Sequence, residues 1–169
     1  MLATIAMPRM AAAESADQVK AAFLFNFARY VEWPEVAFAS PESAIRICLI
    51  GGEGFRQILS AAVAGRTVGD RPVEVAPLGS LDDAARCHLL FFEEDAVAQG
   101  ASVAERIGSQ AVFTISDRAG FAADGGIANF ILVEQKIRFE INPRAAKRAG
   151  LKISSSLLRL AKIVDEDGR

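Results

Sequence analysis

The chain has 169 residues, of which 51% are hydrophobic, and a formal net charge of −2. This length suits one domain, and the apolar content is enough for a buried core and excludes a disordered chain. The small net charge excludes the strong positive field of a nucleic-acid-binding protein. No apolar run reaches the roughly 20 residues that span a bilayer, so we expect no membrane insertion.

The first 13 residues have features of an export leader. They are mildly apolar and end in Ala11-Ala12-Ala13, before Glu14. Signal peptidase accepts only small side chains at its cleavage site. We therefore interpret residues 1–13 as the end of a truncated signal peptide, with an ordinary N-terminal extension as the alternative. The predicted domain covers residues 16–164, and residues 165–169 form a polar tail.

Strands and helices alternate through the first two thirds of the predicted domain. Val19, Phe23 and Phe27 recur at helical spacing, which predicts a helix over residues 16–31 that ends before Trp33-Pro34. Short apolar runs predict buried strands, and the stretches between them predict helices. The expected strands are residues 45–50, 73–76, 89–92 and 111–115, and the helical segments are residues 53–63, 81–85 and 97–107.

The pattern changes after residue 116. Residues 117–126 are rich in turn formers, and Gly125-Gly126 suits positive φ before a strand. Residues 127–133 and 136–141 predict an antiparallel hairpin. Helices are expected from the Asn142 cap to residue 149, and over residues 154–163. We predict an α/β fold with three layers: a mostly parallel sheet, an antiparallel C-terminal hairpin edge, and helices on both faces.

Polar residues follow three of the expected parallel strands. They are Gly51 and Gly52, Glu94, and Asp117. Ligands bind at the carboxyl edge of open α/β sheets, so these loops form a candidate ligand edge. The glycine turn could offer backbone N–H groups to an anion, and the carboxylates could hold Mg²⁺. A tight turn and acids at a helix start are the structural alternatives.

The sequence offers no catalytic set. His88 is the only histidine, so every histidine-based triad or dyad would need it, and we expect packing instead. Ser154-Ser155-Ser156 lacks the lysine of a Ser-x-x-Lys motif, and helix capping explains it better. One histidine and two separated cysteines give no zinc spacing. We therefore expect a protein that binds a partner, with no enzymatic activity, cofactor or metal.

The two cysteines, Cys48 and Cys87, lie beside predicted strands. An even pair in an exported chain indicates one disulfide. Two buried free thiols are the alternative.

An ordered set of short stretches resembles the YfiR family, over about residues 19–162. No single stretch is diagnostic, but their order and spacing are specific. They include Lys20-Ala21-Ala22-Phe23-Leu24-Phe25-Asn26-Phe27-Ala28, Trp33-Pro34, Cys87-His88-Leu89-Leu90-Phe91, Gly125-Gly126-Ile127-Ala128-Asn129-Phe130, Arg138-Phe139-Glu140-Ile141-Asn142 and Ala149-Gly150-Leu151-Lys152-Ile153-Ser154-Ser155.

The resemblance implies a periplasmic regulator that forms dimers and represses a membrane-bound diguanylate cyclase by binding its periplasmic part. An OmpA-type outer-membrane lipoprotein sequesters the best-known member, which raises cyclic-di-GMP and promotes biofilm. Cys48 and Cys87 match a disulfide pair of the family. A second family pair is absent, because residues 127–132 and the stretch around Asn142 contain no cysteine.

The sequence does not decide which residues contact the partner. Exposed aromatic residues are typical of such a face, and Tyr30 and Trp33 at the end of the first helix are candidates. Phe23 and Phe27 share that helix, with the core as their alternative place. A periplasmic sensor that captures a small ligand at the strand ends is the alternative function.

Overall fold

The computed structural model describes residues 14–96 and 100–166. The expected leader at residues 1–13 lies outside the described residues, as do the last three residues of the expected tail. The helix predicted over residues 97–107 is described from Gly100 onward.

The centre of the fold is an eight-stranded sheet with the order β10-β8-β7-β6-β5-β2-β4-β3. The five strands from β4 to β7 run parallel, whereas β7 pairs with β8, and β3 with β4, in antiparallel fashion. The mostly parallel sheet with an antiparallel hairpin is thus confirmed. The strands are β2 (Ile45–Ile50), β3 (Thr67–Val68), β4 (Arg71–Pro77), β5 (Leu89–Phe92), β6 (Phe113–Ser116), β7 (Ala128–Val133), β8 (Lys136–Ile141) and β10 (Lys162–Ile163).

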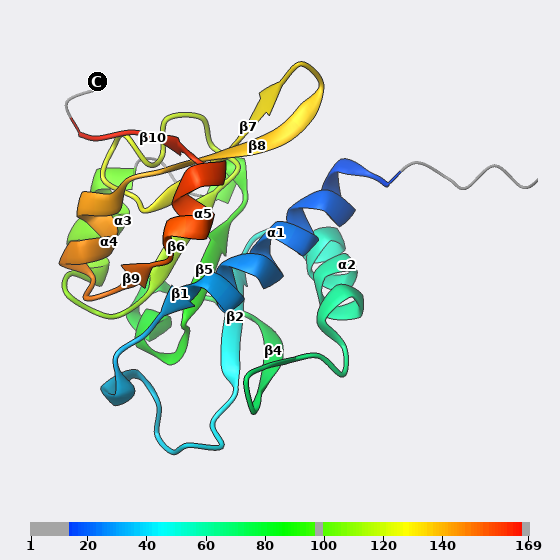
Figure 1. The fold of residues 1–169 in the computed structure, drawn as a ribbon, viewed down its shortest axis with the longest axis vertical. Coiled ribbons are helices and arrows are strands. Elements are labelled where there is room, and N and C mark those ends of the chain that lie inside the picture. Colours follow the sequence, from blue (N-terminus) through cyan, green and yellow to red (C-terminus); the bar gives the residue numbers. More distant parts are fainter. Residues whose placement is uncertain (1–13, 97–99, 167–169) are drawn as a thin grey trace, which may run out of the picture.

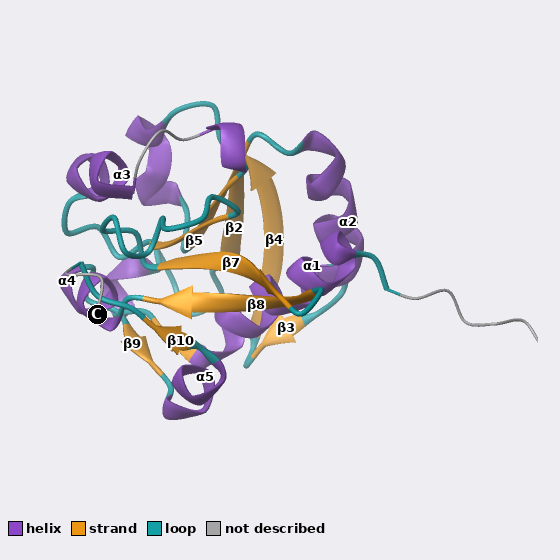
Figure 2. Ribbon diagram, turned by 90° about the horizontal axis from the view of Figure 1, so that it is seen from above, coloured by secondary structure: helices purple, strands orange, loops and turns teal. Residues whose placement is uncertain are grey.

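Helices cover both faces of this sheet, which gives the predicted three layers (Figures 1 and 2). One face carries α1 (Ala16–Tyr30), α2 (Glu53–Val63) and α5 (Ser155–Leu160). The other face carries the 3₁₀ helix η2 (Leu81–Arg86) and α3 (Gly100–Ile107). The short helix α4 (Pro143–Arg148) follows the hairpin and lies beside α3, and η1 (Glu35–Ala37) and η3 (Glu94–Ala96) are single turns.

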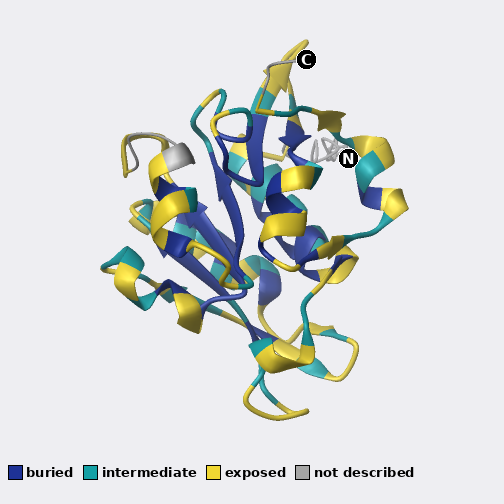
Figure 3. Ribbon diagram, turned by 90° about the vertical axis from the view of Figure 1, so that its left-hand side faces the viewer, coloured by how far each residue is buried: buried dark blue, intermediate teal, exposed yellow. Residues whose placement is uncertain are grey.

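The central strands are buried on both sides (Figure 3). In β5, Leu89 and Phe91 join the core under α1 and α2, and Leu90 and Phe92 join the core under α3. Side chains alternate between the faces of a strand, so a strand covered on both sides needs apolar residues at every position. This explains why the strand signals in the sequence are continuous apolar runs.

Helix α1 supplies aromatic side chains to the core. It begins with a capping box, in which the Ser15 side chain accepts from the Gln18 N–H and the Gln18 side chain accepts from the Ser15 N–H. Phe27 is fully buried, and its ring lies 5.5 Å from that of Phe113 and 5.0 Å from that of Phe139. Phe23 packs on the rings of Phe27 and Phe139, so this face of α1 belongs to the core.

The single helix predicted over residues 154–163 is wrong. Helix α5 ends at Leu160, and the chain then runs beside β8 as the two-residue strand β10, where Val164 N–H donates to Ile141 O at 2.9 Å. A strand this short is defined by its partner and leaves no alternation in the sequence. A separate two-stranded antiparallel sheet, β1 (Val31–Glu32) with β9 (Lys152–Ile153), was also not predicted.

Among the described residues, no helix is both long and apolar enough to cross a membrane.

Candidate functional site

The carboxyl ends of β2, β5 and β6 lie next to each other, as the sequence predicted. The N–H of Gly52 donates to Glu93 Oε2 at 2.8 Å. A Cβ on Gly51, where φ is +78°, would lie 2.9 Å from that same carboxylate oxygen. The amino end of α2 therefore holds an anionic side chain, that of Glu93, beside the glycine turn. Glu94 is exposed in η3 and takes no part in this contact.

Asp117 is anchored by a lysine that the sequence reading did not assign to the site. Lys20 Nζ of α1 lies 3.0 Å from Asp117 Oδ1, an oxygen buried from solvent, and 3.9 Å from an Asp17 carboxylate oxygen. Burial raises the pKa of Asp117, the Lys20 charge opposes this, and the carboxylates of Asp17 and Glu93 raise it further. This ion pair connects α1 to the carboxyl end of β6.

A buried polar network fixes the loop at residues 117–126 onto the hairpin. Asn129 Oδ1 accepts from the Ala122 N–H at 2.9 Å, and Asn142 Nδ2 donates to Ala122 O at 3.0 Å. Asn129 Nδ2 also donates to Glu140 Oε2, while Lys162 Nζ lies 2.8 Å from Glu140 Oε1. Of the polar hairpin residues whose place alternation in the sequence had left open, Glu140 and Asn142 are buried with internal partners, whereas Arg138 is exposed.

At the amino end of the strands, His88 is a packing residue. Its Nδ1 accepts from the Arg46 N–H and its Nε2 donates to Ala37 O, both at 3.0 Å. Burial lowers the pKa of His88, which favours the neutral ring. Because Nδ1 accepts from the Arg46 N–H, the proton of the neutral ring is on Nε2. Trp33, a predicted partner-face residue, donates its indole N–H to His88 O at 3.0 Å and helps to enclose this ring.

The disulfide between Cys48 and Cys87 is confirmed. Its Cα atoms are 5.8 Å apart, and both residues are buried in the core under α3. It links the middle of β2 to the residue that precedes His88.

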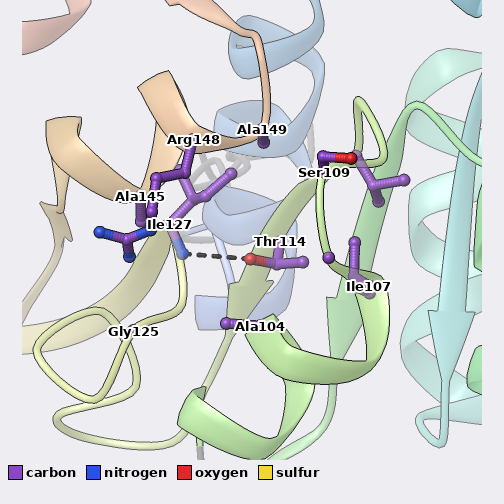
Figure 4. Close-up of a pocket in the computed structure, with 11 residues that line it drawn as sticks. Ala104, Ile107, Ser109, Thr114, Gly125, Ile127, Ala145, Arg148 and Ala149 are labelled. Atoms are coloured by element: carbon purple, nitrogen blue, oxygen red, sulfur yellow. Dashed lines mark hydrogen bonds between the residues drawn. The ribbon is translucent and has the colours of Figure 1, made fainter.

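A pocket of about 400 Å³ opens between α3, β6 and α4 (Figure 4). Apolar side chains line much of it, including Ile107 and Ile127, and Arg148 stands at its side. Thr114 Oγ1 accepts from the Ile127 N–H at 3.1 Å, so two residues that line the pocket are hydrogen-bonded to each other. This pocket lies apart from the predicted ligand edge, because it opens between the two helices and not at the carboxyl ends of the strands.

The described residues contain no cluster of three or more His, Cys, Asp or Glu side chains that could hold a metal ion. Asp117 has a lysine as its neighbour, and the buried His88 lies at the opposite end of the strands. The predicted site residues therefore do not form a general acid–base pair.

Exposed apolar side chains gather at the hairpin edge of the sheet. Leu132 on β7, Leu160 on α5 and Ile163 on β10 are 68%, 68% and 49% exposed. Leu132 lies opposite the half-buried Ile137 of β8, and Ile163 lies opposite Ile141. By strand alternation Leu132, Ile137 and Ile163 face the side that α1 covers, but the hairpin extends beyond α1 (Figures 1 and 3). We call Leu132, Ile137, Leu160 and Ile163 the hairpin patch.

The hairpin patch was missed because its residues read as ordinary strand and helix positions. Of the predicted partner residues, Tyr30 is 39% exposed, and Trp33 is half-buried against His88. Only the three-dimensional pairing of β7, β8 and β10 brings the patch together.

A protein family described as YfiR/HmsC-like matches residues 17–162 of the chain. No curated protein matches the sequence. A conserved domain protein from Vibrio cholerae has a similar solved structure, with a TM-score of 0.55 at 11% identity, covering 89% of this chain and 60% of that one. An ABC domain in complex with L-Trp from Streptococcus pneumonia gives a TM-score of 0.48 at 13% identity, covering 73% of this chain and 55% of that one. The first likeness shows the fold alone.

Proposed function

Because the chain belongs to the YfiR/HmsC-like family, we propose that it is a periplasmic regulator that represses a membrane-bound diguanylate cyclase by binding the periplasmic part of that enzyme. Repression would lower cyclic-di-GMP and biofilm formation. The buried disulfide is consistent with an oxidising compartment, since such bonds persist there and are rare in the cytosol.

The hairpin patch is the observation that carries the proposal. Isolated exposed apolar residues are normal on a protein surface, and we interpret several of them along one edge of the sheet as an interaction site. Leu132, Leu160 and Ile163 come from three elements at one edge of the sheet, and Ile137 of β8 lies opposite Leu132 on the same face. Apolar side chains are typical of the centre of a protein–protein interface.

A binding titration with matched variants tests this proposal. The mature chain is titrated with the purified periplasmic part of a membrane diguanylate cyclase from the same genome. Leu132→Glu should weaken binding by at least about tenfold, since it places a charge in the centre of an apolar contact. Val36→Glu is the control, because Val36 is 92% exposed in η1 and lies outside the patch.

Tight binding that neither variant changes would remove the patch from the interface. The absence of binding to any such cyclase domain would contradict the proposed function itself. The same titration with an OmpA-type outer-membrane lipoprotein tests whether it competes for the chain, and light scattering of the free chain tests whether it forms a homodimer.

A second candidate function, a periplasmic sensor of a small ligand, is favoured by the pocket between α3 and α4 (Figure 4). Its apolar lining suits a small, largely apolar molecule, and this places the site away from the strand ends. A thermal-shift screen of small metabolites tests it. A ligand that raises the unfolding temperature of the wild type but not of Ala145→Phe, which fills the pocket, would support the sensor.

A further inference from the structure

A second open cleft lies at the sheet edge opposite the hairpin patch. It has a volume of about 520 Å³ and lies between the end of α1 and the edge strand β3. Its lining consists of Phe25, Arg29, Arg66, Thr67, Val68 and Gly69. Two arginine side chains from separate parts of the chain therefore share one concave surface.

Arg66 is held in place by the fold. Its guanidinium carbon lies 3.6 Å from the centroid of the Phe25 ring, and that ring is almost completely buried. Its backbone is fixed as well, since the Arg66 N–H donates to Val63 O at 3.0 Å and Arg66 O accepts from the Val73 N–H at 3.3 Å. Stacking on an aromatic ring leaves the edge of the guanidinium free to donate, and a side chain already in place loses less entropy on binding.

The two arginines of this cleft have no carboxylate partner among the described residues. Within residues 14–96 and 100–166, neither Arg29 nor Arg66 has a carboxylate within ion-pair distance. The guanidinium carbon of Arg29 lies 5.5 Å from the centroid of the neighbouring Tyr30 ring. Elsewhere on the surface, Arg46 pairs with Glu74 and Arg56 with Glu53. The cleft is thus a concave site with two unneutralised positive charges.

We propose that the cleft between α1 and β3 binds a phosphate group. Guanidinium groups donate in pairs to phosphate oxygens, and two arginines match the two negative charges of a phosphate monoester. Thr67 of β3 also lines the cleft. The phosphate comes either from a small phosphorylated molecule, as a doubly charged monoester, or from a phospholipid headgroup, as a singly charged diester. Both present the unesterified phosphate oxygens to which guanidinium groups donate.

The position of the cleft makes this site independent of partner binding. Strand β3 and strand β10 form the two ends of the sheet order, so the cleft and the hairpin patch lie at opposite edges. A phosphate ligand and a protein partner can therefore be bound at the same time. Failure of one proposal leaves the other unaffected.

Nuclear magnetic resonance of the arginine Nε–H groups tests the proposal directly. Glycerol 3-phosphate, titrated at low chloride, should shift the Arg66 and Arg29 signals in a saturable way, with Kd below about 10 mM. Arg66→Gln should weaken binding by at least about tenfold, because it removes charge-assisted hydrogen bonds. Arg56→Gln removes a charge that is already paired with Glu53 and should leave binding unchanged.

Two further arms separate the sources of the phosphate. Sedimentation with phosphatidylglycerol vesicles that depends on Arg66, without binding of glycerol 3-phosphate, would support the site with a lipid as its ligand. The absence of a response to both probes would overturn the proposal. Binding of a glutamate-rich peptide through Arg66, with neither phosphate probe bound, would also overturn it and assign the cleft to an acidic protein partner.

Discussion

Gly126 provides a sharp test of how the loop at residues 117–126 packs. A Cβ at this position would lie 2.2 Å from Cε1 of Phe121, a ring that is fully buried and lies 5.7 Å from the Phe92 ring. The backbone of Gly126 is outside the left-handed region, so alanine there would be opposed only by the clash of its Cβ with Phe121. At Gly125, where φ is +107°, the backbone conformation itself would also oppose a side chain. The sequence had suggested positive φ for both glycines, and this is wrong for Gly126.

Gly126→Ala should lower the free energy of unfolding by about 2–3 kcal/mol, the usual cost of forcing extra volume into a packed core. For a chain of this size, this corresponds to a fall in unfolding temperature of about 4–12 °C, measured by circular dichroism. Phe121→Leu removes the ring edge, so the double variant should lose less stability than the sum of the two single variants.

Gly54→Ala is the matched control. Gly54 lies in the first turn of α2, and a Cβ there has no heavy atom within 4 Å. This variant should gain about 0.5–1 kcal/mol, because alanine suits a helix better than glycine does. An unfolding temperature of Gly126→Ala at or above that of the wild type, with Gly54→Ala as expected, would refute the packing of Phe121 against Gly126.

Further predictions concern the disulfide, the histidine and the hairpin turn. Replacing Cys48 and Cys87 by alanine should cost up to about 4 kcal/mol in urea unfolding, from the entropy of a loop with sequence separation 39; an unchanged midpoint would contradict this. The pKa of His88 is held below its ordinary 6.5, so as the pH falls this residue is protonated in the unfolded chain before it is protonated in the folded one. The free energy of unfolding should therefore decrease below about pH 6.5, by at most about 1.4 kcal/mol per pH unit. In His88→Gln the dependence of the free energy of unfolding on pH should lose this contribution. Glu134 and Gln135 have φ of +49° and +63°, so Glu134→Asn with Gln135→Gly should raise the free energy of unfolding by roughly 0.5–1 kcal/mol in the same assay.

Elements with local signals were predictable from the sequence. Helix α2 has its predicted bounds, because a glycine turn precedes Glu53 and Gly65 follows its last turn. The hairpin was predicted from its two β-rich runs, although Glu134-Gln135 is not a usual pair for a tight turn with positive φ. Both predictions rest on residues that are close in the sequence.

Contacts between distant residues were not predictable. The Lys20–Asp117 ion pair joins residues almost 100 positions apart, and Lys20 by itself reads as a surface residue of an amphipathic helix. The strand β10 and the hairpin patch depend on how the last residues return to β8, and two residues carry no periodicity. The strand ends converge as predicted, and the contact of the Gly52 N–H with Glu93 at this edge joins residues too far apart in the sequence to be predicted.

Hydrogen exchange of the chain, measured with and without the periplasmic part of the cyclase, tests the central claim most directly. Binding through the hairpin patch should slow the exchange of amides in β7, β8 and β10 and leave those of η1 and β3 unchanged. Slower exchange confined to η1 or β3, or no change at saturating concentrations of the cyclase domain, would contradict the account.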